Sequence, residues 1–286
     1  MFLKKNENFS YKKYYVSRFK KIVVPYVIFV CIFYLYFLKN GYFEFSLCEL
    51  AKYILSGDLV SHFYFVIVIV QFYLLRPLWR YMLDKISPFA AGCTSLMITV
   101  LFGQYFPDII NFVFGKNFGY NDRLFTTYLF YWVMGCYAGE NYKSFCNEIM
   151  KNKYIISVLF VLFAAADAAV SYIRFSGGEA IIWLENLHII YSVLAILFWS
   201  VISLYIGKYI MKLSAFGIID KSSYYIYLIH PLFIFIVNGI MKKIGIAGVG
   251  KAFLVRSASV YICSFALCGA YTVIRGSLIS HIKKRR

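Results

Sequence analysis

Long apolar runs alternate with short polar and basic stretches along the whole chain. A helix that crosses the hydrocarbon core of a bilayer needs about 20 apolar residues, with a range of about 17 to 25. Eight runs approach this length, and the fourth is the shortest. They are Ile22–Leu38, Leu59–Leu78, Pro88–Phe106, Leu124–Gly139, Tyr154–Ile173, Leu187–Ile206, Ser223–Met241 and Ala252–Ile274. The pattern predicts an all-α, polytopic transmembrane helix bundle of about eight spans.

The composition agrees with a membrane protein. Of the 286 residues, 62% are hydrophobic and only 15% are charged, and the mean hydropathy is +0.69. This apolar excess is larger than the core of a soluble domain requires. No soluble domain, long linker or repeat interrupts the pattern, so we expect a single integral membrane domain over residues 1–286.

The distribution of the basic residues indicates an orientation. The net charge of +17 could suggest a nucleic-acid partner, but the charges lie in short clusters between the apolar runs. With the N-terminus in the cytoplasm, 21 of the 30 Lys and Arg residues fall on the cytoplasmic side, as the positive-inside rule requires. We therefore expect both termini in the cytoplasm and no nucleic-acid partner.

Polar residues inside apolar runs are costly and point to functional positions. Asp167 and Arg174 share one helix face with Ser171 in the fifth run. Two interpretations remain open: Asp167 pairs with Arg174 or a backbone donor to fix helix packing, or the two line a polar cavity.

Two histidines also lie in apolar runs, His62 in the second and His230 in the seventh. His62 opens the second run, beside an aromatic stretch, and is either an interfacial residue or part of a site. In "SSYYIYLIHPLF", Ser223, Tyr227 and His230 fall on one helix face. Pro231 cannot donate to the Tyr227 carbonyl, and a freed carbonyl in a membrane is tolerated only against protein or water. His230 is therefore expected to face inward, as a structural or a cavity residue. No spacing supports a metal site.

A basic segment precedes the first apolar run. In "SRFKKIVVPY", Arg18, Lys20 and Lys21 stand at the cytoplasmic mouth of the helix. They are either positive-inside anchors or a binding site for an anionic cytoplasmic ligand, such as the phosphates of a nucleotide-like donor.

Three of these segments resemble motifs of the acyltransferase-3 family of membrane O-acyltransferases, which includes carbohydrate O-acetylases. They are the basic motif "SRFKKIVVPY", the span "HFYFVIVIVQFYLLRPL" and the late motif "SSYYIYLIHPLF", which follow one another in the family's order from Arg18 to Phe233. Together, in a multi-span chain, they are far more specific than each is alone.

The resemblance implies a bundle of about ten helices in a bacterial cytoplasmic membrane. It implies transfer of an acyl group, usually acetyl, from cytoplasmic acyl-CoA to a hydroxyl of a cell-surface or lipid-linked carbohydrate. Acyl-CoA is then a co-substrate, and no bound cofactor is expected. Arg18 and Lys21 match the basic pair thought to meet acyl-CoA, while His62 and His230 match the family's histidines in their motifs, without an assigned role.

The chain departs from the family's pattern at its start. The family has two helices before the basic motif, and the first carries an arginine and the histidine taken as the catalytic base. We expect this part to be lacking and the 286-residue chain alone not to acetylate. Two rival functions remain open: a carrier or flippase for lipid-linked sugars with Asp167 and Arg174 in its pathway, and a non-catalytic membrane partner of a polysaccharide synthesis complex.

Overall fold

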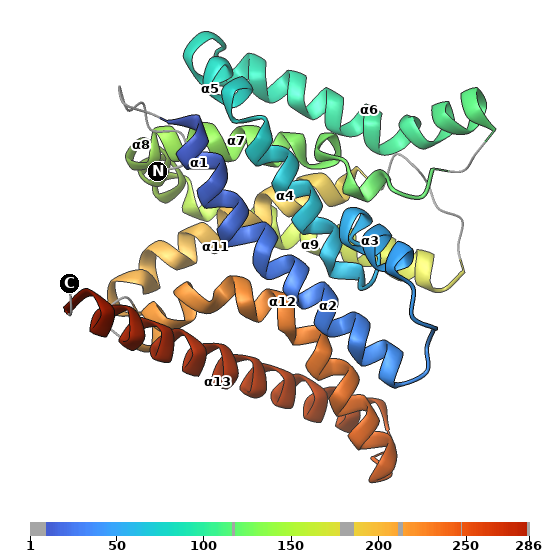
Figure 1. Ribbon diagram of the computed structural model, residues 1–286. Helices are drawn as coiled ribbons and strands as arrows, with labels where there is room; N and C mark the ends of the chain where they lie inside the picture. Colours follow the sequence, from blue (N-terminus) through green and yellow to red (C-terminus); the bar gives the residue numbers. More distant parts are fainter. Residues whose placement is uncertain (1–9, 116–117, 178–185, 211–213, 247, 285–286) are drawn as a thin grey trace. The chain divides into compact units, whose positions relative to one another are not determined.

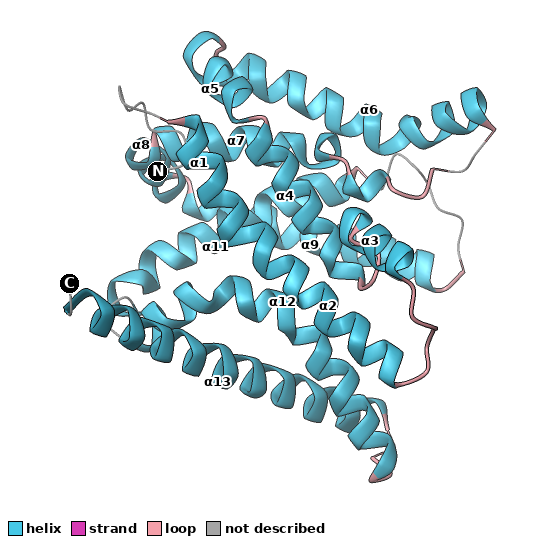
Figure 2. Ribbon diagram, in the orientation of Figure 1, coloured by secondary structure: helices cyan, strands magenta, loops and turns pink. Residues whose placement is uncertain are grey.

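The computed structural model describes residues 10–115, 118–177, 186–210, 214–246 and 248–284 (Figures 1 and 2). Within these ranges all regular secondary structure is helical, as Figure 2 shows, which confirms the predicted all-α class. Internal contacts divide the chain into two compact units. The first unit holds residues 1–11 and 68–208, and the second holds residues 12–67 and 209–286.

The second unit is organised around one long helix at its N-terminal side. This helix runs without interruption from Tyr11 to Lys39 and has three parts: α1 (Tyr11–Arg18), a π-helical segment (Phe19–Val23) and α2 (Val24–Lys39). One side of α2 is buried, with Val30 and Phe33 fully covered, whereas Ile28 and Leu35 are exposed. Such a division suits a helix that packs on protein with one side and on lipid with the other.

The remaining helices of the second unit pack on or near α2. α3 (Leu47–Ser56) and α12 (Ser214–Lys243) both contact α2, and α13 (Val249–Lys284) runs beside α12 (Figure 1). A short 3-10 turn, Ser61–Phe63, leads into α4 (Tyr64–Leu74). The hydroxyl of Tyr26 on α2 donates to the carbonyl of Ile54 at 2.9 Å, which fixes α3 against the long helix.

The described residues of the first unit form six further α-helices. α6 packs on α7, and α8, α9 and α11 share an apolar cluster of Ile149, Ile156 and Val201. The rings of Phe160 and Phe198 stack in the same region with centroids 4.4 Å apart. The helices are α5 (Arg76–Lys85), α6 (Pro88–Phe114), α7 (Leu129–Glu140), α8 (Tyr142–Lys151), α9 (Lys153–Phe175) and α11 (Leu187–Ile210).

The expected number of eight spans is too high for the part of the chain that the structure describes. Six helices there are long and apolar enough to cross a membrane, or seven if the bent pair Leu47–Ser56 and Ser61–Leu74 forms one span. The expected fourth span, Leu124–Gly139, begins with a 3-10 turn at Phe125–Tyr128, and α7 has only 12 residues. At 1.5 Å per residue, α7 rises about 18 Å, well short of the roughly 30 Å core.

Two proline residues also act differently from the expectation. The second predicted span, Leu59–Leu78, is interrupted at Leu75, because Pro77 lies in the first turn of the new helix α5. Pro107 directly follows the third expected span, Pro88–Phe106, but lies inside α6, which continues to Phe114. An internal proline removes one backbone hydrogen bond and bends a helix without ending it where packing supports both halves.

Gly57 is the tightest backbone position in the second unit. It ends α3 in the left-handed conformation, with φ of +69°. A methyl group at this position would stand 3.0 Å from the carbonyl carbon of Phe63 and 3.0 Å from the backbone nitrogen of Tyr64. Only glycine therefore allows the end of α3 to approach the turn that carries His62.

Replacing Gly57 tests this close approach. We expect Gly57→Ala to lower the free energy of unfolding by about 2–3 kcal/mol, since it adds both backbone strain and a clash. Gly41→Ala is the matched control, because Gly41 has φ of +74° in the same unit but open space around it. Its cost should be about 1 kcal/mol. Thermal unfolding in detergent measures both, and an equal loss in the two variants would contradict the close approach.

Candidate functional site

The basic motif lies on an irregular stretch of helix. Phe19–Val23 forms a π-helical turn, in which the backbone N–H of Val24 donates to the carbonyl of Phe19. Single π turns inside α-helices are rare and occur frequently at functional sites. Pro25 follows within the same continuous helix, where its missing N–H removes one hydrogen bond to the preceding turn. Lys20 and Lys21 are thus presented by a turn that has an extra residue relative to an α-helix.

The late motif on α12 connects the other two motifs. The hydroxyl of Tyr224 donates to the carbonyl of Ile22, next to Lys21, at 2.8 Å. The hydroxyl of Tyr227 donates to the backbone carbonyl of His62. Both bonds lie within the second unit. Three segments that are far apart in the sequence therefore meet in one unit, in contact through two tyrosines.

His62 and His230 lie together at the centre of this arrangement. Their ring centroids are 5.2 Å apart, and the ring of Tyr227 lies 5.1 Å from that of His62. Phe63 and Phe33, both fully buried, complete an aromatic surrounding, with centroids 4.4 Å and 6.3 Å from the His62 ring. The two histidines proposed from separate motifs thus form one pair in a largely apolar environment.

The proline after His230 determines the state of its ring. Pro231 lies inside α12 and cannot donate to the Tyr227 carbonyl four residues earlier. The Nδ1 atom of His230 lies 2.9 Å from that carbonyl oxygen. Because a carbonyl only accepts, Nδ1 must carry a proton. In the neutral ring the lone pair then belongs to Nε2, the arrangement that a proton acceptor requires.

His62 is in a different situation. Within the described residues, both of its ring nitrogens are buried without a hydrogen bond of acceptable geometry, although the backbone of Leu228 is close enough to interact with the ring. A buried polar atom without a partner is costly. Such an atom beside a second histidine is a natural contact point for a polar ligand group.

Other predicted residues lie outside this pair. Ser223, expected on the same face as His230, is exposed and donates to the carbonyl of Asp220 at 2.9 Å. In the first unit, Asp167 contacts His188, with Oδ1 3.2 Å from Nδ1. This contact joins α9 to α11, so Asp167 has a partner other than the expected Arg174. Arg174 is exposed at the end of α9.

The three basic residues of the first motif do not act as one cluster. The Arg18 guanidinium lies over the ring of Tyr14, 5.3 Å from its centroid. Lys21 is exposed. Lys20 lines a cavity together with Arg275 of α13. The sequence analysis did not single out Arg275, because nothing in the sequence connects the end of the last span to the basic motif.

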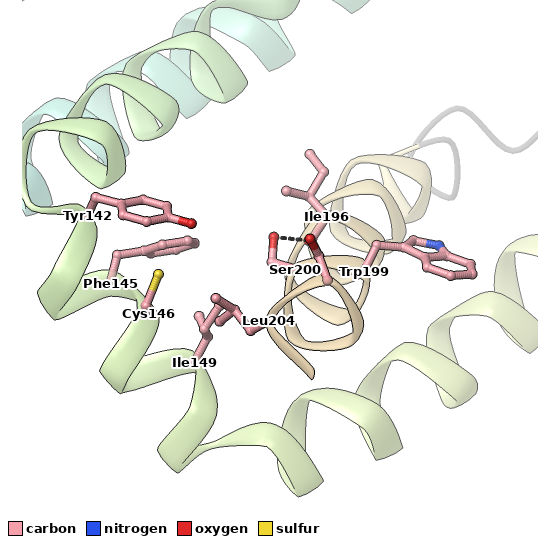
Figure 3. A pocket seen from close by; sticks show the side chains of 9 residues that line it. Tyr142, Phe145, Cys146, Ile149, Ile196, Trp199, Ser200 and Leu204 are labelled. Carbon is pink, nitrogen blue, oxygen red and sulfur yellow. Dashed lines mark hydrogen bonds between the residues drawn. The ribbon is translucent and has the colours of Figure 1, made fainter. Parts of the chain in front are cut away.

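A second cavity, of about 370 Å³, lies in the first unit between α8 and α11. Figure 3 shows Tyr142, Phe145 and Cys146 on α8 facing Ser200 on α11, while Trp199 points away. The Ser200 hydroxyl donates to the carbonyl of Ile196 at 2.7 Å, and a hydrogen bond with Cys146 raises the pKa of Tyr142. The lining has no charged residue, and the hydroxyls of Ser200 and Tyr142 have partners, so we assign it no chemistry.

The hydrogen bond of His230 gives a direct prediction. In Pro231→Ala, the new backbone N–H competes for the Tyr227 carbonyl, and His230 should lose its fixed tautomer. Nitrogen NMR of labelled histidine should show nearly pure Nδ1–H for His230 in the wild type and a mixture of tautomers in the variant. Pro107→Ala in α6 is the control for helix straightening and should leave His230 unchanged. An unaltered tautomer in Pro231→Ala would contradict the assignment.

Comparison with known proteins gives one positive result. A family model described as an acyltransferase domain matches residues 1–274. No significant match is found among curated proteins or among solved structures. The family match covers nearly the whole chain, and the described part has six or seven helices fit to span a membrane. The chain therefore belongs to the acyltransferase-3 family of membrane proteins.

Proposed function

We propose that the chain transfers an acyl group, acetyl in the first instance, from cytoplasmic acyl-CoA to a hydroxyl of a cell-surface or lipid-linked carbohydrate in a bacterial cytoplasmic membrane. The observation that carries the proposal is the pairing of His62 with His230 of α12, whose ring centroids are 5.2 Å apart. α12 also binds the basic motif through the hydroxyl of Tyr224. The histidine pair suits an uncharged acceptor hydroxyl, and the basic motif in the same unit suits the negatively charged acyl-CoA.

The histidine pair can move the proton that acyl transfer requires. In the proposed step, Nε2 of His230 accepts the proton of the acceptor hydroxyl while its oxygen attacks the thioester carbonyl. An N–H of His62, which makes no hydrogen bond of acceptable geometry within the described residues, donates to the developing oxyanion and stabilises it. When the carbon–sulfur bond breaks, the proton on His230 passes to the thiolate of CoA. His230 thus supplies a base that the motif comparison did not assign.

The donor requires cations for its phosphates. Arg18 is the best suited, because a guanidinium binds phosphate oxygens in a planar, two-pronged manner. Lys21 supplies a second charge three residues further along the helix, and its exposure leaves the ammonium accessible. Lys20, also expected at this site, faces a different cavity.

Binding of the donor can be tested without knowledge of the acceptor. We expect the double variant Arg18→Gln, Lys21→Gln to weaken acetyl-CoA binding at least tenfold, since bonds to charged groups contribute about 1.5–3 kcal/mol each. Isothermal calorimetry on the purified chain in lipid nanodiscs measures the affinity. Lys12→Gln with Lys39→Gln is the matched control, because both residues are exposed cations of the same unit. A wild type without affinity for acetyl-CoA would support the carrier alternative.

The role of the histidines requires a transfer assay. The probe is radiolabelled acetyl-CoA, with an extract of cell-envelope carbohydrate as the acceptor mixture. We expect His230→Ala to lower transfer by about 10²–10⁴-fold, the usual contribution of a general base, with acetyl-CoA affinity unchanged. His188→Ala, in the first unit, is the control.

The two assays separate the outcomes. Equal transfer rates in the wild type and in His230→Ala would refute His230 as the base. Intact acetyl-CoA binding without any transfer by the wild type would agree with the expectation that the chain alone is inactive, and would restrict the histidine pair to ligand binding.

A further inference from the structure

The second unit contains a cavity of about 480 Å³ between α2, α12 and α13. Its walls are mainly apolar, and several wall residues are exposed, including Ile28 (52%) and Leu267 (51%). Two cations, Lys20 and Arg275, and two tyrosines, Tyr225 and Tyr271, are part of the lining. The cavity therefore combines apolar, lipid-accessible walls with positive charge.

This cavity is separate from the histidine pair. On α12 it is lined by Tyr225 and Ile229, whereas Tyr227 and His230 contact His62. At about 100° per residue, the two sets of side chains lie on nearly opposite faces of the helix. On α2 the cavity includes Ile28, while fully buried Phe33 contacts His62. A ligand in the cavity would thus occupy the outward side of these helices.

Among the described residues that line the cavity, no acidic side chain balances its positive charge. The Arg275 guanidinium donates to the hydroxyl of Tyr225 at 2.9 Å and also interacts with the hydroxyl of Tyr271, whose ring meets that of Tyr225 at 5.2 Å. These contacts orient the guanidinium and leave further N–H donors available. Lys20 makes no ion pair or hydrogen bond with any residue in the described ranges.

We propose that this cavity is a binding groove for an anionic membrane phospholipid, whose phosphate binds between Lys20 and Arg275 and whose acyl chain lies along the apolar wall. Basic pockets between membrane helices bind anionic headgroups, and the exposed wall of Ile28 and Leu267 matches a hydrocarbon chain. Along the long helix that includes α2, the wall continues from Lys20 in the π-helical turn to Ile32, about 18 Å of helix. A small phosphate compound would leave this apolar surface uncovered.

The proposal gives Lys20 a role distinct from that of Arg18 and Lys21, so it does not depend on the proposed acyl transfer. Lys20 alone of the three lines the cavity. Lipid binding and acetyl-CoA binding should therefore respond to different substitutions within one short motif.

The test compares two lipids in reconstituted vesicles. Spin-labelled phosphatidylglycerol and phosphatidylcholine are added to the purified full chain in phosphatidylcholine vesicles, and electron spin resonance gives their relative association constants. We expect the wild type to prefer phosphatidylglycerol. This preference should fall about fivefold in Lys20→Gln and about fivefold again in the double variant Lys20→Gln, Arg275→Gln. The control Lys242→Gln, Lys243→Gln removes two exposed charges of α12 outside the cavity and should keep the preference.

Competition identifies the ligand. Glycerol 3-phosphate and acetyl-CoA should not displace labelled phosphatidylglycerol, since neither covers the apolar wall from the lipid side. Displacement by glycerol 3-phosphate would reduce the site to a phosphate site and overturn the lipid assignment. Displacement by acetyl-CoA would show that Lys20 belongs to the acyl-CoA site and would also overturn the lipid assignment.

An equal loss of preference in the control variant would show a general surface charge effect and also overturn the proposal. Because Lys20→Gln changes an exposed side chain, it tests the groove even if the double variant does not fold.

Discussion

The hydrogen bond from His230 to the Tyr227 carbonyl is the interaction on which the candidate site depends. Pro231 frees this carbonyl, and an unpaired carbonyl within a membrane helix would be costly. The imidazole next to the proline satisfies it at 2.9 Å. The same bond removes the ambiguity between the two ring nitrogens. One hydrogen bond therefore satisfies the carbonyl that Pro231 leaves free and fixes which ring nitrogen of His230 carries the proton.

α12 gives the second unit two distinct surfaces. One face carries Tyr227 and His230 towards the turn that holds His62. The other face carries Tyr225 and Ile229 towards the cavity with Lys20 and Arg275. Since helical side chains that are two and five residues apart point in different directions, a single motif of twelve residues can serve both. This explains why the motif is rich in tyrosine: each ring adds area and each hydroxyl reaches a backbone or side-chain partner.

The helical class could be predicted from the sequence, because apolar run length is a local property. The cost of polar groups in lipid also singled out His62 and His230 as candidates, without their pairing. The interruption at Leu75, the continuation of α6 through Pro107 and the shortness of α7 were not predicted, since packing decides whether a proline bends or ends a helix. The meeting of His62 with His230 followed from neither segment alone. Arg275 was missed because its partner Tyr225 lies 50 residues away in the sequence.

The π-helical turn at Phe19–Val23 sets the rotational phase between the basic motif and the span that follows. One additional residue in a helix turns everything on its far side by about 100°. With a regular α-helix in its place, the residues before the turn would point in other directions relative to α2. Arg18, Lys20 and Lys21 would then face different sides of the helix, although no residue type had changed. The number of residues in this turn, as well as their charge, therefore determines which side of the helix each cation faces, and a one-residue deletion here would reorient the basic motif relative to α2.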